Sequence, residues 1–331
     1  MDMSELRWNP LLATWTIVAA NRQNRPNMPE NYCPFCPGEG KKVPDDYEVC
    51  MFPNDFPALS DGIEGNWDIT GGDLYKTATA KGNCEVILYS SDHHRQMYEL
   101  SDAHMKKLVD LWVERFIYYR KQPLVKYVYE FENRGKEVGV TMPHPHGQLY
   151  AFPYVPAKIE TELVNAKRYF EQSGRNLFQD MIQEELEDGR RIIFETGSFL
   201  VFLPHFTDFP YGIFIVSKLP ILWIDELNEE QKNELGIVIK SVNGMFDQLF
   251  DSIFPYMMCM HQGTVNESHW QEQADFYRFH IEYYPPLRAP ETIKYYASAE
   301  TGAWAATNTR NVEDTAIELR KALEVYKSKY P

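Results

Sequence analysis

The sequence predicts an α+β protein made of two similar halves, each an antiparallel sheet with helices packed against it. The order strand, amphipathic helix, strand, strand occurs twice along the chain, which points to a duplicated unit. Aligning YELSDAHMKKL with DELNEEQKNEL superimposes the two sets with a shift of about 130 residues. The 331 residues are 44% hydrophobic and 14% aromatic, enough to bury one large core. We therefore expect an N-terminal half at 1–170 and a C-terminal half at 171–331 that form a single structural unit.

The first set starts with CEVILYSS, a predicted strand because of its β-branched content. The segment ELSDAHMKKLVDLWVERFIYYRKQ follows, and Ser101 or Asp102 can cap a helix there. Helical spacing places a group of apolar side chains on one face: Met105, Leu108, Val109, Trp112, Phe116 and Ile117. Two predicted strands, VKYVYEFEN and TMPHPHGQLYAF, complete the set and are joined by a turn at Arg134 and Gly135.

The second set repeats this order with other residues. It comprises the predicted strand YGIFIVSKLP, the amphipathic helix DELNEEQKNELGIVIKSVNGMFDQLF with Asn228 as its cap, and the strands YMMCMHQG and YRFHIEYYPPL. The alignment carries His144 and His146 close to His280 and Glu282. A chance likeness between two amphipathic helices is the alternative to duplication.

Charge and composition exclude several classes of protein. The net charge of -15 and the pI of about 5.1 argue against a nucleic-acid-binding surface, so local positive groups must hold any polyanionic ligand. The start, MDMSELRWNP, lacks a basic stretch followed by an apolar run, and no window reaches about 18 uninterrupted apolar residues. We expect a cytoplasmic protein with neither a signal peptide nor a membrane-spanning helix.

The cysteines fit the same compartment, because five scattered residues cannot form a disulfide framework. Cys50, Cys84 and Cys259 are most simply small, partly buried hydrophobic residues. The other two, Cys33 and Cys36, lie in the Pro-rich stretch NRQNRPNMPENYCPFCPGEGKKVPDDY, a predicted long ordered loop. Loops of this length usually carry function.

Cys33 and Cys36 have the spacing of two zinc thiolates, and a tetrahedral site then needs two more nitrogen or sulfur ligands. Histidines are the available donors: His93 and His94 in SSDHHRQM, and His144 and His146 in TMPHPHGQLY. A redox pair fits less well, because that motif opens a helix and the prolines here oppose one. An ordinary loop with two cysteines is the other alternative.

His144 and His146 would share one face of an extended segment. Both could be metal ligands, both could be hydrogen-bonded packing residues, or one could be a ligand and the other chemically active. Gly147 allows a ligand or another backbone to come close, and Gln148 offers an uncharged amide on the same face as His146. A neutral imidazole beside a neutral donor suits attack on an anion, since a carboxylate at 148 would repel a phosphoryl oxygen. The pattern therefore favours phosphoryl or nucleotidyl transfer over proton abstraction.

Five motifs in order extend this interpretation: CPFC, SSDHH, FEN, PHPHGQ and HIEYYPPLR. Together they resemble the galactose-1-phosphate uridylyltransferase family, the transferase branch of the histidine triad superfamily, over nearly the whole chain. The resemblance implies a double displacement in which an imidazole attacks the α-phosphorus of a UDP-sugar and expels the sugar 1-phosphate. The uridylyl-imidazole then waits for a second sugar 1-phosphate. The expected substrates are UDP-glucose with galactose 1-phosphate or a related hexose 1-phosphate.

The resemblance assigns roles to individual residues. His146 matches the nucleophile and Gln148 the glutamine that hydrogen-bonds the phosphoryl oxygens. The matching zinc ligands are Cys33, Cys36, His93 and His144, with His94 as the local competitor of His93. The matching substrate-binding residues are Arg22, Arg25 and Asn133 for phosphate, Asn54, Asp55 and Phe56 for uridine, Thr141 beside the motif, and Lys294 and Glu300 for the sugar phosphate and sugar hydroxyls.

A second metal site is also implied, with iron or zinc bound by one glutamate and three histidines. The matching positions are Glu162, His261, His280 and Glu282, so one histidine is replaced by glutamate. Such a set would suit iron, zinc or manganese. A buried, hydrogen-bonded polar cluster is the alternative.

Some positions depart from the family pattern. Thr141 and Met142 stand where serine and asparagine are usual, Ala299 replaces a tyrosine, and a family glutamine falls near Ala306. Losing a hydroxyl and an amide would enlarge the sugar pocket, so the hexose choice is expected to be altered or broadened.

Two other functions compete with this interpretation. A nucleoside-diphosphate-sugar or dinucleoside-polyphosphate phosphorylase or adenylyltransferase of the same superfamily would use His146 identically but recognise adenine. The NDF segment, Gln148 and YYPPL favour the uridylyl branch. A non-catalytic nucleotide-binding module is the alternative of another class, and it leaves His146 unexplained. The resemblance further implies a homodimer, in which part of the sugar pocket could come from the partner.

Overall fold

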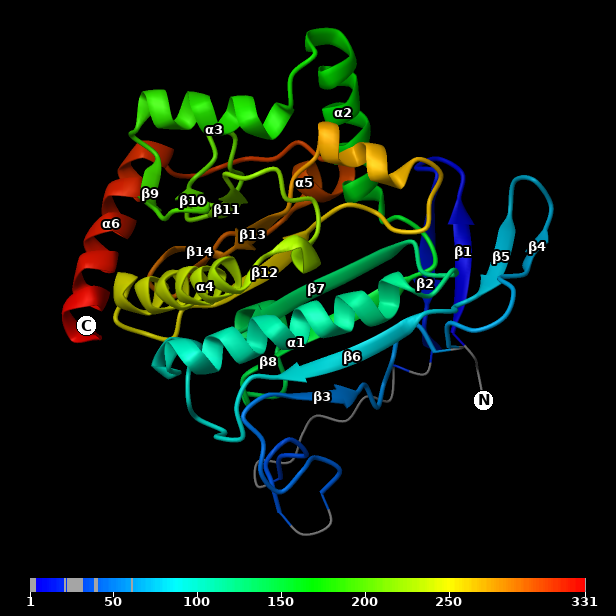
Figure 1. The fold of residues 1–331 in the computed structure, drawn as a ribbon, viewed down its shortest axis with the longest axis horizontal. Coiled ribbons are helices and arrows are strands. Elements are labelled where there is room, and N and C mark those ends of the chain that lie inside the picture. Colours follow the sequence, from blue (N-terminus) through cyan, green and yellow to red (C-terminus); the bar gives the residue numbers. More distant parts are fainter. Residues whose placement is uncertain (1–3, 21, 23–31, 39–40, 61, 331) are drawn as a thin grey trace.

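Nine strands drawn from both halves of the chain form one antiparallel sheet (Figure 1). This computed structural model describes all residues except 1–3, 21, 23–31, 39–40, 61 and 331. Across the sheet the strands are β3 (Cys50–Pro53), β6 (Asn83–Leu88), β8 (His146–Phe152), β7 (Tyr127–Arg134), β12 (Tyr256–His261), β13 (His280–Tyr284), β11 (Phe214–Ser217), β10 (Phe199–Phe202) and β9 (Ile192–Glu195).

The sheet order confirms the predicted repeat of strand, helix, strand, strand. The first set is β6, α1 (Asp102–Arg120), β7 and β8, and the second is β11, α4 (Glu229–Leu249), β12 and β13. In the sheet the first set has the order β6-β8-β7, and the second set, read from the opposite end of the sheet, has the order β11-β13-β12. Each set therefore places its first strand outermost, its last strand next and its middle strand innermost. The two sets join where β7 pairs antiparallel with β12. The predicted division at 170/171 falls inside α2 (Ala157–Ser173) and stays a prediction.

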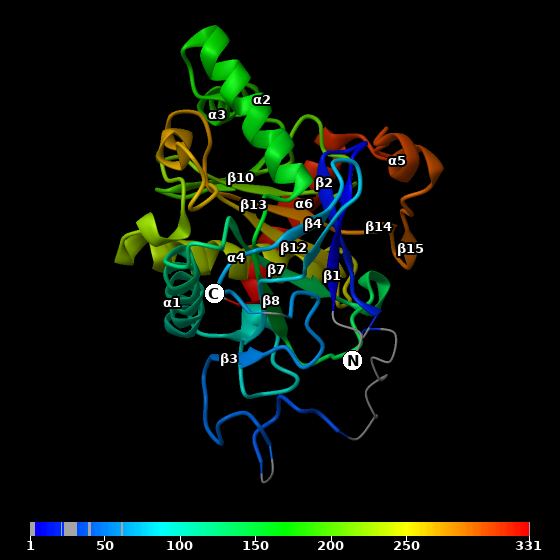
Figure 2. The ribbon, with the colours of Figure 1, turned by 90° about the vertical axis from the view of Figure 1, so that its right-hand side faces the viewer.

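The helices α1 and α4 cover one face of this sheet (Figures 1 and 2). Their predicted caps are confirmed, because the Ser101 side chain accepts a hydrogen bond from the backbone N–H of His104, and Asn228 accepts from that of Gln231. The predicted apolar face of α1 is buried except at Ile117, which is half-buried.

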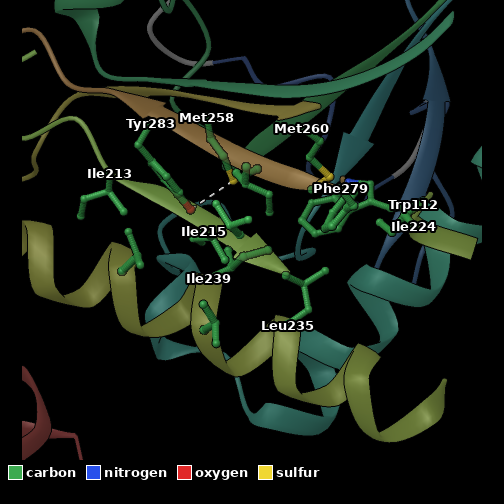
Figure 3. Close-up of a cluster of buried hydrophobic side chains, with 14 of the residues drawn as sticks. Trp112, Ile213, Ile215, Ile224, Leu235, Ile239, Met258, Met260, Phe279 and Tyr283 are labelled. Atoms are coloured by element: carbon green, nitrogen blue, oxygen red, sulfur yellow. Dashed lines mark hydrogen bonds between the residues drawn. The ribbon is translucent and has the colours of Figure 1, made fainter. Parts of the chain in front are cut away.

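Figure 3 shows the core between the sheet and these helices. Trp112 of α1 and Ile239 of α4 belong to this core, together with strand side chains such as Met258 and Tyr283. Since successive strand residues point to opposite faces, the alternate residues lie on the face away from α1 and α4. Gln148 pairs with Phe131, and both belong to this second face. This second face carries the polar strand residues singled out in the sequence.

The predicted strand over TMPHPHGQLYAF is wrong in its first part. β8 begins only at His146, and residues 141–145 are irregular. Pro143 and Pro145 have no backbone N–H to give to a ladder, which explains the late start. His144 therefore lies before the strand, and the expectation that both histidines lie on one strand face does not hold.

The remaining elements lie around this sheet. A four-stranded sheet has the order β2 (Thr14–Val18), β1 (Glu5–Asn9), β5 (Lys76–Thr79), β4 (Ile69–Gly71), and β14 (Leu287–Ala289) pairs with β15 (Thr292–Ile293). The other helices with bounds in the described part of the chain are α2, α3 (Leu177–Asp188), α5 (Ser298–Ala303), α6 (Val312–Lys329) and the short 3-10 helices η2 (Met97–Glu99), η3 (Lys136–Val138), η4 (Ile224–Glu226) and η5 (Trp270–Asp275). Figure 1 shows α2 and α3 at the end of the main sheet that carries β9 and β10. No helix in the described part of the chain is long and apolar enough to cross a membrane.

Candidate functional site

Four of the predicted metal ligands come together beside the start of β8. The ligand atoms of Cys33, Cys36, His93 and His144 all lie within 4.8 Å of one another. The Cys36 sulfur lies 3.4 Å from His93 Nδ1 and 3.7 Å from His144 Nδ1. A tetrahedral ion with bonds of about 2.1 Å to nitrogen and 2.3 Å to sulfur would hold ligand atoms roughly 3.5 Å apart. These residues could therefore hold a metal ion, and His93 belongs to the set while the His94 side chain is exposed.

Burial shifts the pKa values of His144 and Cys36, two of these side chains. The Nε2 of His144 lies 2.7 Å from the Ser90 carbonyl oxygen, so the other ring nitrogen, Nδ1, faces the cysteines. Burial lowers the pKa of His144 to about 4, so its imidazole is neutral and can act as a ligand. Burial, followed by the neighbouring Cys33, raises the pKa of the Cys36 thiol to about 11. A bound metal would reverse this second effect by stabilising both thiolates.

His146 is oriented by the backbone carbonyl of His144, one of these four residues. Its Nδ1 lies 2.7 Å from the carbonyl oxygen of His144, so Nδ1 carries the proton and Nε2 keeps the lone pair. The ring of Phe35, between the two cysteines, lies 5.4 Å from the His146 ring and 6.0 Å from that of His144. Sequence reasoning did not single out Phe35, although its place in CPFC was a usable signal.

Two cavities meet at His146. One, of about 340 Å³, includes Asn54, Asp55, Phe56 and Gln148 in its lining. The other, of about 850 Å³, is lined partly by Asn133. Thr141, Met142 and His146 line both cavities. Both volumes suit a small ligand, and the shared boundary is a place where a group could pass between two bound molecules.

The NDF segment forms one wall of the smaller cavity by way of a local turn. The Asn54 side chain accepts a hydrogen bond of 2.9 Å from the backbone N–H of Phe56. The Asp55 carboxylate pairs with Lys42 at 2.7 Å, with both side chains largely exposed. Such an exposed pair adds little stability, so these groups can exchange partners when a ligand enters.

Gln148 lies on the open face of β8 with Tyr150 beside it. The Tyr150 hydroxyl lies 3.5 Å from Gln148 Oε1. This contact directs the amide oxygen toward Tyr150 and the amide N–H groups away from it. Burial raises the pKa of Tyr150, and nearby Arg22 opposes the rise, which places the Arg22 guanidinium beside this strand. Arg25, the other predicted phosphate-binding arginine, lies outside the described residues.

Lys294 and Glu300 are not brought to His146 within one chain, since neither lines the two cavities there. The Lys294 side chain is buried near the rings of Phe209 and Tyr296, and its ammonium has no hydrogen-bond partner among the described residues. Glu300 caps the start of α5, accepting a hydrogen bond of 3.2 Å from the backbone N–H of Ala297.

A second polar cluster lies on the same face of the sheet, at β12 and β13. The ligand atoms of Glu162, His261 and His280 lie within 4.8 Å of one another and could hold a metal ion. Glu282 is adjacent, with carboxylate oxygens 3.8 Å from His261 Nε2 and 3.5 Å from His280 Nε2. Lys158, which sequence reasoning missed, pairs with Glu282. Its four-residue spacing from Glu162 on one helix was the available signal.

Gly147 lies between His146 and Gln148 in the sequence, and the structure has no room for a side chain at this position. A Cβ atom there would overlap the Tyr89 hydroxyl and lie 3.1 Å from the Phe131 carbonyl oxygen. We expect Gly147→Ala to lower the free energy of unfolding by about 1–3 kcal/mol, because the strand must move off its neighbours. Denaturant unfolding measures this. Gly72→Ala, where the added atom meets nothing within 4 Å, is the control, and equal stability of both variants would contradict the prediction.

Comparison with known proteins gives a consistent result. Residues 1–156 match the model of the galactose-1-phosphate uridyl transferase N-terminal domain, and residues 162–320 match that of the C-terminal domain. The galactose-1-phosphate uridylyltransferase of Thermotoga maritima is 38% identical over 321 residues, covering 96% of this chain and 98% of that protein. The Kluyveromyces lactis enzyme of the same name is 29% identical over 321 residues, covering 88% of this chain and 86% of that protein.

Solved structures agree with this result. A uridylyltransferase structure superposes with a TM-score of 0.87 at 27% identity and covers 97% of this chain and 99% of that chain. An ADP-glucose phosphorylase from Arabidopsis thaliana gives a TM-score of 0.73 at 20% identity, covering 96% of this chain and 99% of that chain, a likeness that shows the fold alone.

Proposed function

Because the chain belongs to the galactose-1-phosphate uridylyltransferase family, we propose that it moves UMP between a UDP-sugar and a sugar 1-phosphate through a uridylyl group on His146. The position of His146 supports this most strongly. Its ring is held by the His144 carbonyl at the boundary of two ligand-sized cavities. We propose UDP-glucose and galactose 1-phosphate, or a related hexose 1-phosphate, as the substrates.

The first half of the proposed reaction forms a covalent intermediate. The Nε2 lone pair of His146 attacks the α-phosphorus, a nitrogen–phosphorus bond forms, and the bond from this phosphorus to the bridging oxygen breaks. The departing sugar 1-phosphate takes that electron pair. The ring becomes cationic, and the His144 carbonyl oxygen, which accepts a hydrogen bond from Nδ1–H with a nitrogen–oxygen distance of 2.7 Å, stabilises the developing charge.

The second half reverses the first with another sugar 1-phosphate. A phosphate oxygen of the acceptor attacks the α-phosphorus, and the imidazole leaves as a neutral group. The uridine is proposed to stay in the smaller cavity beside Asn54, Asp55 and Phe56 throughout. The sugar phosphates would enter and leave through the larger cavity, past Asn133 and Thr141.

Gln148 is proposed to donate a hydrogen bond to a phosphoryl oxygen, together with Arg22 and Arg25. We expect Gln148→Glu to lower kcat/KM by about 10²–10³-fold, because a carboxylate repels the phosphoryl group where a donor is needed. Steady-state kinetics with UDP-glucose test this. Gln172→Glu adds the same charge on the exposed surface of α2 and is the matched control. Wild-type kinetics in the Gln148→Glu enzyme would rule out the contact.

Zn²⁺ is the metal proposed for Cys33, Cys36, His93 and His144, because two thiols and two imidazoles are a typical tetrahedral zinc set. When bound, it would stabilise the loop and the backbone that hold His146. A second divalent ion, iron, zinc or manganese, is proposed at Glu162, His261 and His280, with Glu282 as a further ligand.

The acceptor sugar phosphate is proposed to use residues from a second copy of the chain in a cytoplasmic homodimer. Lys294 is proposed to meet the sugar phosphate, because a buried ammonium with no hydrogen-bond partner in the described part of the chain suits an anionic ligand. Glu300 would accept hydrogen bonds from the sugar hydroxyls. Ala299 and Ala306 offer none of the hydroxyl and amide groups that read a sugar, which supports altered or broadened hexose choice.

Intact-protein mass spectrometry tests the proposal directly. The protein is mixed briefly with UDP-glucose, UDP-galactose, UDP-N-acetylglucosamine or ADP-glucose without acceptor. A uridylyl mass gain is expected, whereas an adenylyl gain would favour the phosphorylase or adenylyltransferase branch. Binding of a donor without any mass gain would favour the non-catalytic module. Acceptor assays that show strict preference for galactose 1-phosphate would contradict the broadened hexose choice.

A further inference from the structure

Acceptor atoms converge at the second cluster. The Nδ1 of His280 lies 2.9 Å from the Arg278 carbonyl oxygen and therefore carries the proton, so Nε2 faces Glu282 Oε1 at 3.5 Å as an acceptor. The Nδ1 of His261 lies 2.9 Å from Glu162 Oε2, and its Nε2 faces Glu282 Oε2 at 3.8 Å. The side chains of His261, His280 and Glu282 are all at most 3% exposed. Buried lone pairs and carboxylates at this spacing need a positive charge among them.

Lys158 already supplies one positive charge there. Its ammonium lies 2.5 Å from Glu282 Oε2 and 3.7 Å from Glu162 Oε1, and it also hydrogen-bonds the Tyr284 hydroxyl. Lys158 lies in the first turn of α2, and its side chain is 55% exposed, whereas the Glu282 side chain is 3% exposed. Lys158 thus reaches a buried carboxylate from the solvent side.

We propose that Lys158 competes with a divalent metal ion for Glu282, so that the second centre exchanges between an ion pair and a metal-bound state. An ammonium and a dication repel each other at a few ångströms in a buried site, so simultaneous binding of both to this carboxylate is unfavourable. Glu282 makes the competition possible because a carboxylate can pair with an ammonium or ligate a metal ion. The proposal rests on the second metal centre, and it is independent of the chemistry at His146.

Metal titration of Lys158 variants tests the competition. The protein is loaded with one equivalent of Zn²⁺ to fill the cysteine site and is then titrated with further Zn²⁺ by calorimetry. We expect Lys158→Met to bind the second zinc about 10–100-fold more tightly than the wild type, because the metal no longer has to displace an ammonium from Glu282. Lys158→Arg keeps the charge and should stay near the wild-type affinity. The second zinc should also raise the melting temperature of Lys158→Met more than that of the wild type.

Lys167→Met is the matched control, because Lys167 lies on the same helix, is also 55% exposed and pairs with Glu171. It should leave the affinity unchanged. His261→Ala in the Lys158→Met background should abolish the second site and thereby locate it. Equal affinities of wild type and Lys158→Met would overturn the competition and leave the metal centre standing. Failure of both proteins to bind a second zinc would overturn the centre and the competition together, while mass gain from UDP-glucose would still report on His146.

Discussion

His146→Ala is expected to abolish the uridylyl mass gain from every donor and to lower the transfer rate by about 10⁴-fold or more. The reason is that the reaction proceeds through a bond to His146 Nε2, and a backbone carbonyl already holds that ring in the attacking tautomer. Without the imidazole, transfer would require direct attack of one sugar phosphate on the other substrate. Rapid-mix mass spectrometry and steady-state assays measure both effects.

His205→Ala is the control for this variant, because His205 is exposed and lines neither cavity at His146. It should retain the mass gain and near-normal rates. The metal content and melting temperature of His146→Ala should also stay normal, since His146 is not one of the proposed zinc ligands. A covalent uridylyl adduct that persists in His146→Ala would show that another residue is the nucleophile.

Cys36→Ala is expected to remove one zinc ion per chain and to destabilise the protein by on the order of 5 kcal/mol. The Cys36 sulfur lies within 3.7 Å of ring nitrogens of both His93 and His144, so its loss dismantles the tetrahedral set. The His144 carbonyl that orients His146 then loses its support, and the rate of uridylyl transfer should fall as well. Elemental analysis, denaturant unfolding and adduct formation measure the three consequences.

Cys84→Ala provides the matched comparison, because Cys84 is a buried cysteine outside both clusters. It should keep its zinc and lose only about 1 kcal/mol of stability through a small cavity. If Cys36→Ala keeps full zinc content and the stability of Cys84→Ala, the cysteine pair is not a metal site.

Local patterns predicted much of this fold, because they depend on residues close together in the chain. The caps at Ser101 and Asn228 and the buried face of α1 follow from spacing alone. The repeated order of elements predicted the duplicated unit, which the sheet order confirms. The late start of β8 at His146 was missed, although Pro143 and Pro145 carried the signal.

For the site, the sequence by itself determined which residue types are available: two cysteines with metal spacing, histidines to complete the set, and a neutral amide two residues after His146. Only the tertiary structure decided which of them meet. In the structure His93, and not His94, belongs to the possible metal site, and His144 lies before the start of β8. His146 lies where two cavities meet. It also left Lys294 and Glu300 away from those cavities and brought Lys158 onto Glu282, 124 residues away in the chain. Contacts of this kind depend on how strands pair and helices pack across long separations, which local spacing does not encode.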